Sequence, residues 1–286
     1  MIAITGATGQ LGRLVIEALM QELSTSQIVA VVRNPEKAED LMSRGLLVRQ
    51  ADYNQPATLP AALEGVDKVL LISSSEVGQR IRQHGAVIEA AQDAGAKLLA
   101  YTSLLHADTS PLGLRAEHHE TEKLLRASGM PFVVLRNGWY TENYMRSLSA
   151  ALENGVILGC ASDGRIASAA RADYAAAAAA VLIRDNQADR IYELAGDTTY
   201  TMNKLAAEIT RQTNKTVEYK DLPEKEYKAA LVEGGMPEEF AAMLAETDVG
   251  ISKGALFDDS CQLSQLIGRS TTPLAKTIAA AIKELG

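Results

Sequence analysis

Three glycines near the start of the chain have a spacing that could bind phosphate. Gly6, Gly9 and Gly12 lie between an apolar run at residues 2–5 and an amphipathic stretch that follows without a break. The first permits a tight turn, the second lets backbone amides approach a pyrophosphate, and the third allows a helix to pack closely on the strand. The next apolar run, residues 27–34, comes where the second strand of a β-α-β unit would lie. The pattern predicts a dinucleotide-binding loop; an ordinary glycine-rich turn is the alternative.

The residue at the end of the second apolar run distinguishes between two cofactors. An Asp or Glu there would accept a hydrogen bond from a ribose 2′-hydroxyl and select NAD. This chain has Arg33, and the first acidic side chain, Glu36, comes only after Pro35. A guanidinium offers planar donors that match a phosphate, so the sequence favours NADPH, with Arg33 on the 2′-phosphate. A solvated surface arginine is the alternative.

The elements that would position these residues alternate along the first half of the chain. Apolar runs of strand length are separated by helical patterns, as expected for parallel strands with helices on both faces of the sheet. We therefore predict an α/β fold with a doubly wound parallel sheet of the Rossmann type. The predicted strands after the first are residues 27–34, 46–53, 67–75, 97–104 and 131–140, and the helices between them include 56–65, 77–94 and 115–128.

Beyond residue 150 the pattern changes to shorter pieces. An alanine-rich helix at 173–185 and a strand at 190–196 are predicted to rejoin the first domain, and a smaller, mainly helical lobe should follow. The predicted domains are 1–197, which binds NADP, and 198–286, which contributes to the substrate pocket. Residues 150–172 fit either domain.

Residues that follow the strands are candidate ligand contacts, because ligands of such sheets lie beyond the carboxyl ends of the strands. Ser73–Ser75 follow the fourth strand and would let a cofactor pass close to the backbone while offering hydroxyl groups. Trp139 and Tyr140 follow the sixth strand, where a nicotinamide or a flat substrate could lie. Loop serines and core aromatic residues are the respective alternatives.

Composition argues against several classes of protein. The chain has 286 residues, is 47% hydrophobic and carries a net charge of −8, and no basic run suggests binding to nucleic acid. Its apolar tracts are too short to cross a membrane, and it begins in a core strand, so we expect no signal peptide and a cytoplasmic location. Cys160 and Cys261 have no metal or redox spacing, so no metal site is predicted.

Five segments together carry a resemblance to a known family. They are GATGQLG, VVRNPEKA, LLISSSEVGQR, YTSLLHADTSPLGL and LRNGWYTENY. The chain resembles the NmrA-like, atypical branch of the short-chain dehydrogenase/reductase superfamily, in particular its bacterial type 2 NADPH:quinone oxidoreductases, with triphenylmethane reductases nearby. The resemblance covers essentially the whole chain and implies a flavin-independent, NADPH-dependent reductase of quinones. The cofactor contacts that it implies are Gly6, Ala7, Thr8, Gly9, Gln10, Leu11, Arg33, Ser73, Ser74, Ser75, Asn137, Gly138, Trp139, Tyr140, Thr141, Glu142 and Asn143.

One departure from the superfamily concerns the reaction. Classical members carry a Tyr-x-x-x-Lys pair before the sixth strand, whereas here the helix reads LRAEHHETEK, with His119 four positions before Lys123. Reduction of an isolated ketone gives an alkoxide that needs a nearby proton donor. Hydride addition to a quinone gives a phenolate, whose conjugate acid has a pKa of about 10, so solvent can protonate it. The missing pair is therefore consistent with a quinone or dye as acceptor.

Catalysis would then depend on orientation of the two flat rings. The predicted positioning residues are Asn143, Trp139 and Tyr140. His118 or His119 could serve as an acid, although the EHHE setting is typical of a solvated helix face.

Two other functions stay open. The first is a dinucleotide-binding sensor of the NmrA-like type without turnover, which would need an exposed partner surface; the aromatic segment after the sixth strand favours the enzyme. The second, a sugar-nucleotide epimerase, is disfavoured by the missing tyrosine and lysine. The predicted partner is a small-molecule quinone, and the oligomeric state is open, with a homodimer as one alternative.

Overall fold

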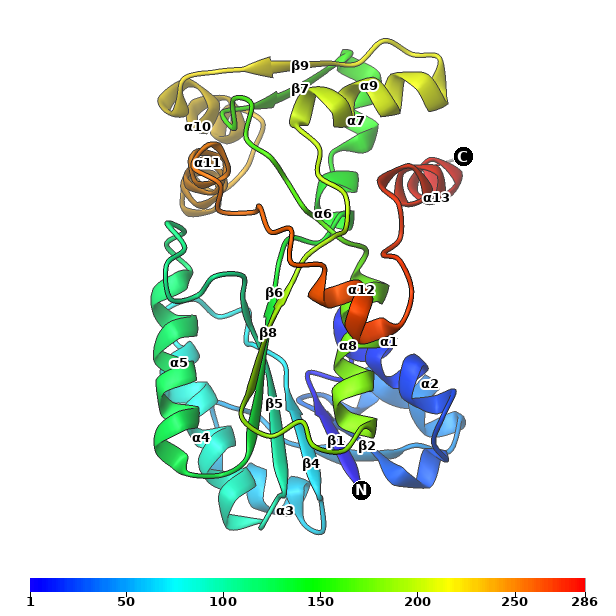
Figure 1. The fold of residues 1–286 in the computed structure, drawn as a ribbon, viewed down its shortest axis with the longest axis vertical. Coiled ribbons are helices and arrows are strands. Elements are labelled where there is room, and N and C mark those ends of the chain that lie inside the picture. The colour runs from blue at the N-terminus through cyan, green and yellow to red at the C-terminus, as the bar shows by residue number, and fades with distance from the viewer. Residues whose placement is uncertain (286) are drawn as a thin grey trace. The chain divides into compact units, whose positions relative to one another are not determined.

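The computed structural model describes residues 1–285, which group into two compact units by their contacts. Unit 1 comprises Met1–Ala107, Ala116–Asn137 and Arg171–Glu193; unit 2 comprises Asp108–Arg115, Gly138–Ala170 and the chain from Leu194 onward. Figure 1 shows the elements of each. Because contacts alone do not define parts that fold independently, the predicted domain boundary between residues 197 and 198 stays a prediction.

Within the described residues, the main sheet has seven strands, and its order confirms the predicted doubly wound fold. The chain starts in the middle of the sheet, builds outward on one side and then returns to build the other side (Figure 1). The order is β3 (Leu47–Gln50), β2 (Ile28–Val32), β1 (Ile2–Thr5), β4 (Lys68–Leu71), β5 (Leu98–Leu104), β6 (Phe132–Asn137) and β8 (Arg190–Leu194). The predicted return of the chain to this sheet is thus confirmed for β8.

Helices cover both faces of this sheet (Figure 1). On one face α1 packs on the alanine-rich α8, whose small side chains allow close approach, and on the other face α3 packs on α4. The bounds are α1 (Gln10–Met20), α2 (Glu39–Ser43), α3 (Leu59–Leu63), α4 (Arg80–Asp93), α5 (Arg115–Ser128) and α8 (Arg171–Ile183), with short 3₁₀ turns η1 (Thr25–Gln27), η2 (Pro35–Ala38) and η3 (Pro56–Thr58). This cover explains why β1 and β2 are buried along their whole length and apolar at every position except Thr5.

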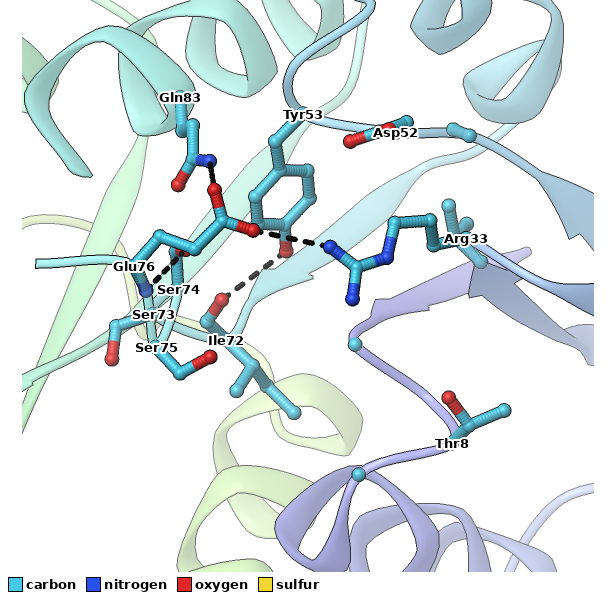
Figure 2. A pocket seen from close by; sticks show the side chains of 14 residues that line it. Thr8, Arg33, Asp52, Tyr53, Ile72, Ser73, Ser74, Ser75, Glu76 and Gln83 are labelled. Atoms are coloured by element: carbon cyan, nitrogen blue, oxygen red, sulfur yellow. Dashed lines mark hydrogen bonds and ion pairs between the residues drawn. The ribbon is translucent and has the colours of Figure 1, made fainter. Parts of the chain in front are cut away.

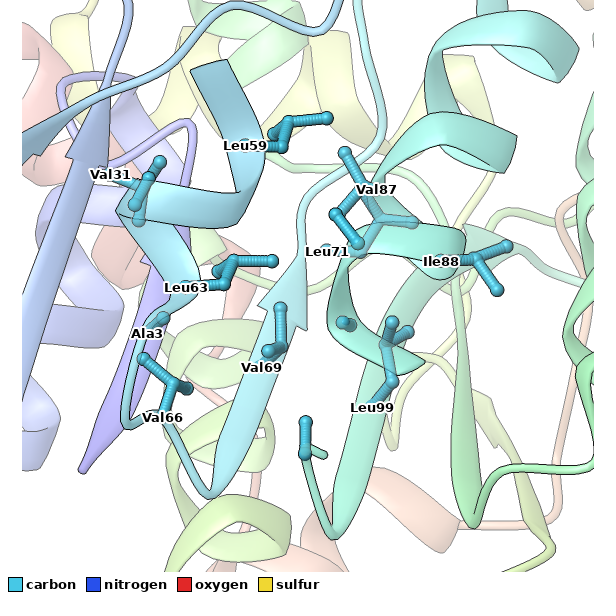
Figure 3. Packing of buried hydrophobic residues seen from close by; sticks show 14 of the residues in the cluster. Ala3, Val31, Leu59, Leu63, Val66, Val69, Leu71, Val87, Ile88 and Leu99 are labelled. Carbon is cyan, nitrogen blue, oxygen red and sulfur yellow. The ribbon is translucent and has the colours of Figure 1, made fainter. Parts of the chain in front are cut away.

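One apolar core of unit 1 lies between the sheet and the α3–α4 layer (Figure 3). Leu59 and Leu63 of α3 and Val87 of α4 are completely buried, and they pack with Val69 and Leu71 of β4. Each such side chain contributes about 1.5–3 kcal/mol when it is removed from water. The core holds the strand ends, and so the loops that follow them, in fixed positions.

Several strands end earlier than the sequence predicts. The predicted strand 67–75 ends at Leu71, because the next amides leave the ladder: Ile72 N–H donates to Thr5 Oγ1 over 3.1 Å, and Ser73 N–H donates to Thr102 Oγ1 over 2.9 Å. The predicted strands 46–53 and 131–140 likewise end at residues 50 and 137. For the strand that ends at Leu71, side chains of other strands set the end, so the apolar pattern alone could not locate it.

Unit 2 is mainly helical and also contains a small sheet. Strands β7 and β9 pair in parallel, with Val156 opposite Glu218. A small core of this unit contains Cys160, Tyr227 and Ala245. The bounds are α6 (Glu142–Met145), α7 (Leu148–Asn154), β7 (Val156–Gly159), α9 (Met202–Thr213), β9 (Glu218–Asp221), α10 (Glu224–Glu233), α11 (Glu238–Ser252), α12 (Gln262–Ile267) and α13 (Leu274–Leu285). Over residues 1–285, no helix combines the length and apolar character required to span a bilayer.

Candidate functional site

A cavity of about 350 Å³ lies beyond the carboxyl ends of β1, β2 and β4 (Figure 2). These strands flank the point where the direction of chain progression reverses, the usual ligand position in doubly wound sheets, and the volume is typical of a small-molecule site. The cavity brings the predicted glycine loop, Arg33 and Ser73–Ser75 together in unit 1. Its lining residues are Gly6, Thr8, Gly9, Val31, Arg33, Ala51, Asp52, Tyr53, Ile72, Ser73, Ser74, Ser75, Glu76 and Gln83.

The glycine loop has the geometry of a phosphate cradle. Gly6 has a φ of +60°, which side-chain-bearing residues rarely adopt, and its carbonyl accepts the Gly9 N–H over 2.9 Å. A β-carbon on Gly12 would lie 2.4 Å from the Gly6 carbonyl oxygen, so only glycine lets α1 start this close to the strand. No side chain caps α1, and its first turn has no acidic residue. The loop therefore fits a pyrophosphate at the positive end of the helix.

Arg33 extends into the cavity and pairs with Glu76, a residue that the sequence analysis missed (Figure 2). Its Nη1 lies 3.1 Å from Glu76 Oε1. The amides of Asn54 and Gln83 donate to Glu76 Oε2 over 3.0 and 2.8 Å. These amide hydrogen bonds, and then Arg33, lower the pKa of Glu76, so a carboxylate is fixed against the guanidinium. The Arg33 side chain is 70% exposed and also lines the cavity, so its contact with a 2′-phosphate stays a prediction.

Tyr53 provides an apolar ring in the wall of the cavity, and the sequence analysis did not single it out (Figure 2). Its hydroxyl donates to Thr5 Oγ1 and lies 3.2 Å from the Ile72 carbonyl oxygen. Burial raises the pKa of Tyr53, so the phenol stays protonated. The ring is thus held by Thr5 of β1 and by the backbone just after β4, and no local pattern in the sequence indicates these contacts.

The other predicted contacts of the N-terminal segment lie next to the cavity. Ala7 is completely buried under the glycine loop, Gln10 is the exposed first residue of α1, and Leu11 is buried. Asn137 ends β6, and its side chain is buried, with no hydrogen-bond partner for Oδ1 among the described residues. Neither Asn137 nor residues 138–143 belong to the lining described above.

The remaining predicted residues, Gly138, Trp139, Tyr140, Thr141, Glu142 and Asn143, lie in unit 2. The Thr141 N–H donates to the Ala169 carbonyl oxygen over 2.9 Å, and the Ala169 N–H donates to the Trp139 carbonyl oxygen over 3.2 Å. Trp139 and Tyr140 are half-buried. The Asn143 N–H donates to the Tyr140 carbonyl oxygen, at the start of α6. These hydrogen bonds give the segment a defined backbone, but they do not assign a role to its side chains.

Tyr144 is a further residue of this segment that the sequence analysis left without a role. Its ring centre lies 6.4 Å from that of Trp139 and 6.4 Å from that of Tyr200. Its hydroxyl oxygen is buried and has no hydrogen-bond partner among residues 1–285. Burial raises the pKa of Tyr144 well above its ordinary value. An unpaired buried phenol is costly to stability, so this group is a candidate donor to a bound molecule.

Comparison with known proteins identifies the family. The model of the NmrA-like family matches residues 1–285. The chain belongs to the NmrA-like family. It is 60% identical over 279 residues to quinone oxidoreductase 2 of Escherichia coli, with 98% of each chain covered. The family predicted from the sequence motifs is therefore confirmed.

Two solved structures extend this comparison of the NmrA-like chain. A crystal structure of an NADPH-dependent quinone oxidoreductase from Escherichia coli, complexed with NADPH, is 60% identical, with a TM-score of 0.97 over 99% of this chain and 100% of that one. The Citrobacter sp. triphenylmethane reductase complexed with NADP(H) is 40% identical, with a TM-score of 0.95 over 98% of this chain and 100% of that one. Both similarities span the two units.

The sequence analysis expected the two histidines of α5 to be exposed to solvent, but in this NmrA-like protein neither side chain is fully exposed. His118 is buried, and its Nδ1 lies 2.7 Å from the Tyr101 hydroxyl. Burial, followed by the charge of Arg80, lowers the pKa of His118 to about 3, which opposes a role as a proton donor at neutral pH. His119 is half-buried. The solvated interpretation is therefore wrong for His118, because its helix face packs on β5.

Proposed function

We propose that this chain is an NADPH-dependent quinone reductase that transfers a hydride directly, without flavin. The observation that carries the proposal is the single cavity that combines the glycine loop, Arg33 and the serine segment at the strand ends. The relatives named above as NADPH-dependent quinone oxidoreductase and triphenylmethane reductase support it. The first is named for a quinone and the second for a triphenylmethane compound.

The residues of the cavity fit NADPH in separate ways. The glycine loop and the start of α1 bind the pyrophosphate, since a β-carbon at Gly12 would close the space between them. Arg33 binds the 2′-phosphate through its planar donors. Ser73–Ser75 let the cofactor pass along the backbone. When bound, NADPH supplies the hydride, which the chain's own side chains cannot provide.

The acceptor is a quinone, and the protein acts on it mainly by orientation. Trp139 and Tyr140 provide flat surface, and Asn143 provides a polar contact to the acceptor or the nicotinamide. The phenolate that forms takes its proton from solvent. A cytoplasmic location, and a homodimer as one oligomeric state, remain parts of this proposal.

The test mixes purified, flavin-free protein with NADPH and benzoquinone and follows the absorbance of the reduced nicotinamide. A parallel run with NADH measures cofactor selectivity, and a triphenylmethane dye tests a second acceptor. We expect NADPH to be oxidised faster than NADH. Tight NADPH binding without turnover over several quinones and dyes would contradict the proposal and favour a dinucleotide sensor.

A further inference from the structure

Two buried side chains of α4 hold the backbone of Ser74, in the wall of the cavity. The Ser74 N–H donates to His84 Nε2 over 2.9 Å. The Ser74 carbonyl oxygen accepts from Arg80 Nε over 2.7 Å. His84 is completely buried and Arg80 is 7% exposed. Both polar backbone groups of the middle serine are therefore satisfied from one helix.

The hydrogen bonds determine which nitrogen of His84 carries the proton. Nε2 accepts from Ser74, so it carries none. Nδ1 lies 2.9 Å from Thr121 Oγ1, and the Thr121 hydroxyl donates its own hydrogen to the Glu117 carbonyl oxygen over 2.9 Å. Nδ1 must therefore be the donor to Thr121, and we assign the neutral tautomer with its proton on Nδ1.

The groups around His84 favour this neutral state. Arg80 faces it from the same helix, the Tyr101 ring of β5 lies edge-on with centres 5.3 Å apart, and Glu117 and His118 belong to the packed helix α5. Burial, and then the charge of Arg80, lower the pKa of His84 to about 3. The acceptor nitrogen is thus available at every pH at which the protein would work.

We propose that His84 is a positioning residue for NADPH, which holds Ser73–Ser75 in the shape that lines the cavity and does not touch the cofactor itself. The proposal rests on the proposed function. Ser74 is half-buried and lies in the cavity wall, so without the Nε2 acceptor its N–H would lose its partner and the segment would shift. The affinity for NADPH would fall, while the chemistry at the nicotinamide would change little.

Two substitutions that differ by one methylene separate the two sides of the imidazole. His84→Gln places an amide oxygen near the position of Nε2, where it can accept from Ser74. His84→Asn places its amide near the position of Nδ1, where it can bond only to Thr121. Tyr101→Phe is the matched control, because it removes a buried hydrogen bond to His118 in the same region and leaves Ser74 untouched.

The experiment measures KM for NADPH, kcat with benzoquinone, NADPH affinity by fluorescence titration, and Tm. An unpaired buried donor is costly, so His84→Asn should raise KM and Kd for NADPH about tenfold, with kcat changed less than about threefold. His84→Gln should stay within about threefold of the wild type. Tyr101→Phe should lower Tm without raising KM more than about twofold.

The outcomes that overturn the inference differ from those that overturn the proposed function. Equal KM values for His84→Gln and His84→Asn, or a KM increase in Tyr101→Phe as large as that in His84→Asn, would mean that His84 only stabilises the fold. A wild-type protein that binds no NADPH would instead overturn the proposed function. If His84→Asn does not fold, KM of His84→Gln more than about tenfold above the wild type would contradict the inference.

Discussion

Arg33→Ala tests whether the guanidinium in the cavity recognises the 2′-phosphate. The Arg33 and Glu76 side chains are 70% and 39% exposed, and pairs this exposed contribute about 0–1 kcal/mol to stability. The variant should therefore unfold with nearly the wild-type free energy. A hydrogen bond to a charged group contributes about 1.5–3 kcal/mol, so Kd for NADPH should rise about 10- to 150-fold, and Kd for NADH by less than about twofold.

Glu76→Gln is the matched control for the same pair. Its carboxylate competes with a phosphate for Arg33, and two unit charges about 4 Å apart interact by about 1 kcal/mol in water. Removal of this charge should lower Kd for NADPH about two- to fivefold and leave NADH unchanged. Fluorescence titrations of both cofactors, at low and high salt, measure these changes. Equal losses for NADPH and NADH in Arg33→Ala would refute the assignment.

Three further predictions concern packing, an unpaired phenol and a buried carboxyl group. Gly12→Ala should abolish NADPH binding and lower Tm, because its β-carbon would lie 2.4 Å from the Gly6 carbonyl oxygen; an unchanged Tm by calorimetry would contradict this. Tyr144→Phe should stabilise the free protein by about 1 kcal/mol in urea unfolding and lower kcat/KM for quinone if the hydroxyl contacts the acceptor; unchanged kcat/KM would remove that role. Burial raises the pKa of Asp248 to about 6, above the unfolded value of about 3.9, so the folded state binds the proton more strongly. The stabilisation is complete below about pH 4 and is lost as pH rises through 6, by up to about 3 kcal/mol. Asp248→Asn, which keeps an acceptor for the Cys160 N–H, should make stability less dependent on pH over this range.

Much of the fold was predictable because it depends on local pattern. β1 and β2 are buried on both faces, so their positions are apolar with the single exception of Thr5, and this is visible in two short stretches of sequence. The strand ends were less predictable. The ladder stops after Leu71 because the hydroxyls of Thr5 and Thr102 take the next amides, and these residues belong to other strands.

The candidate site also contains residues that the sequence predicts and residues that it does not. The glycine loop was predictable because a positive φ at Gly6 and the missing β-carbon at Gly12 are local demands that only glycine meets. The role of Glu76 was not predictable, because many strands are followed by a Glu. Its partner Arg33 lies 43 positions away along the chain, so no local pattern connects the two residues.

The sequence by itself therefore determined the type of sheet, the glycine loop and the cofactor preference, because each rests on residue types within short segments. Only the tertiary structure decided which side chains hold the backbone that lines the cavity. His84 appears in the sequence as an ordinary helix residue, and its acceptor role exists only because Ser74 and Thr121 approach its two nitrogens. Such contacts depend on strand order and helix packing, which bring together residues that no local pattern connects.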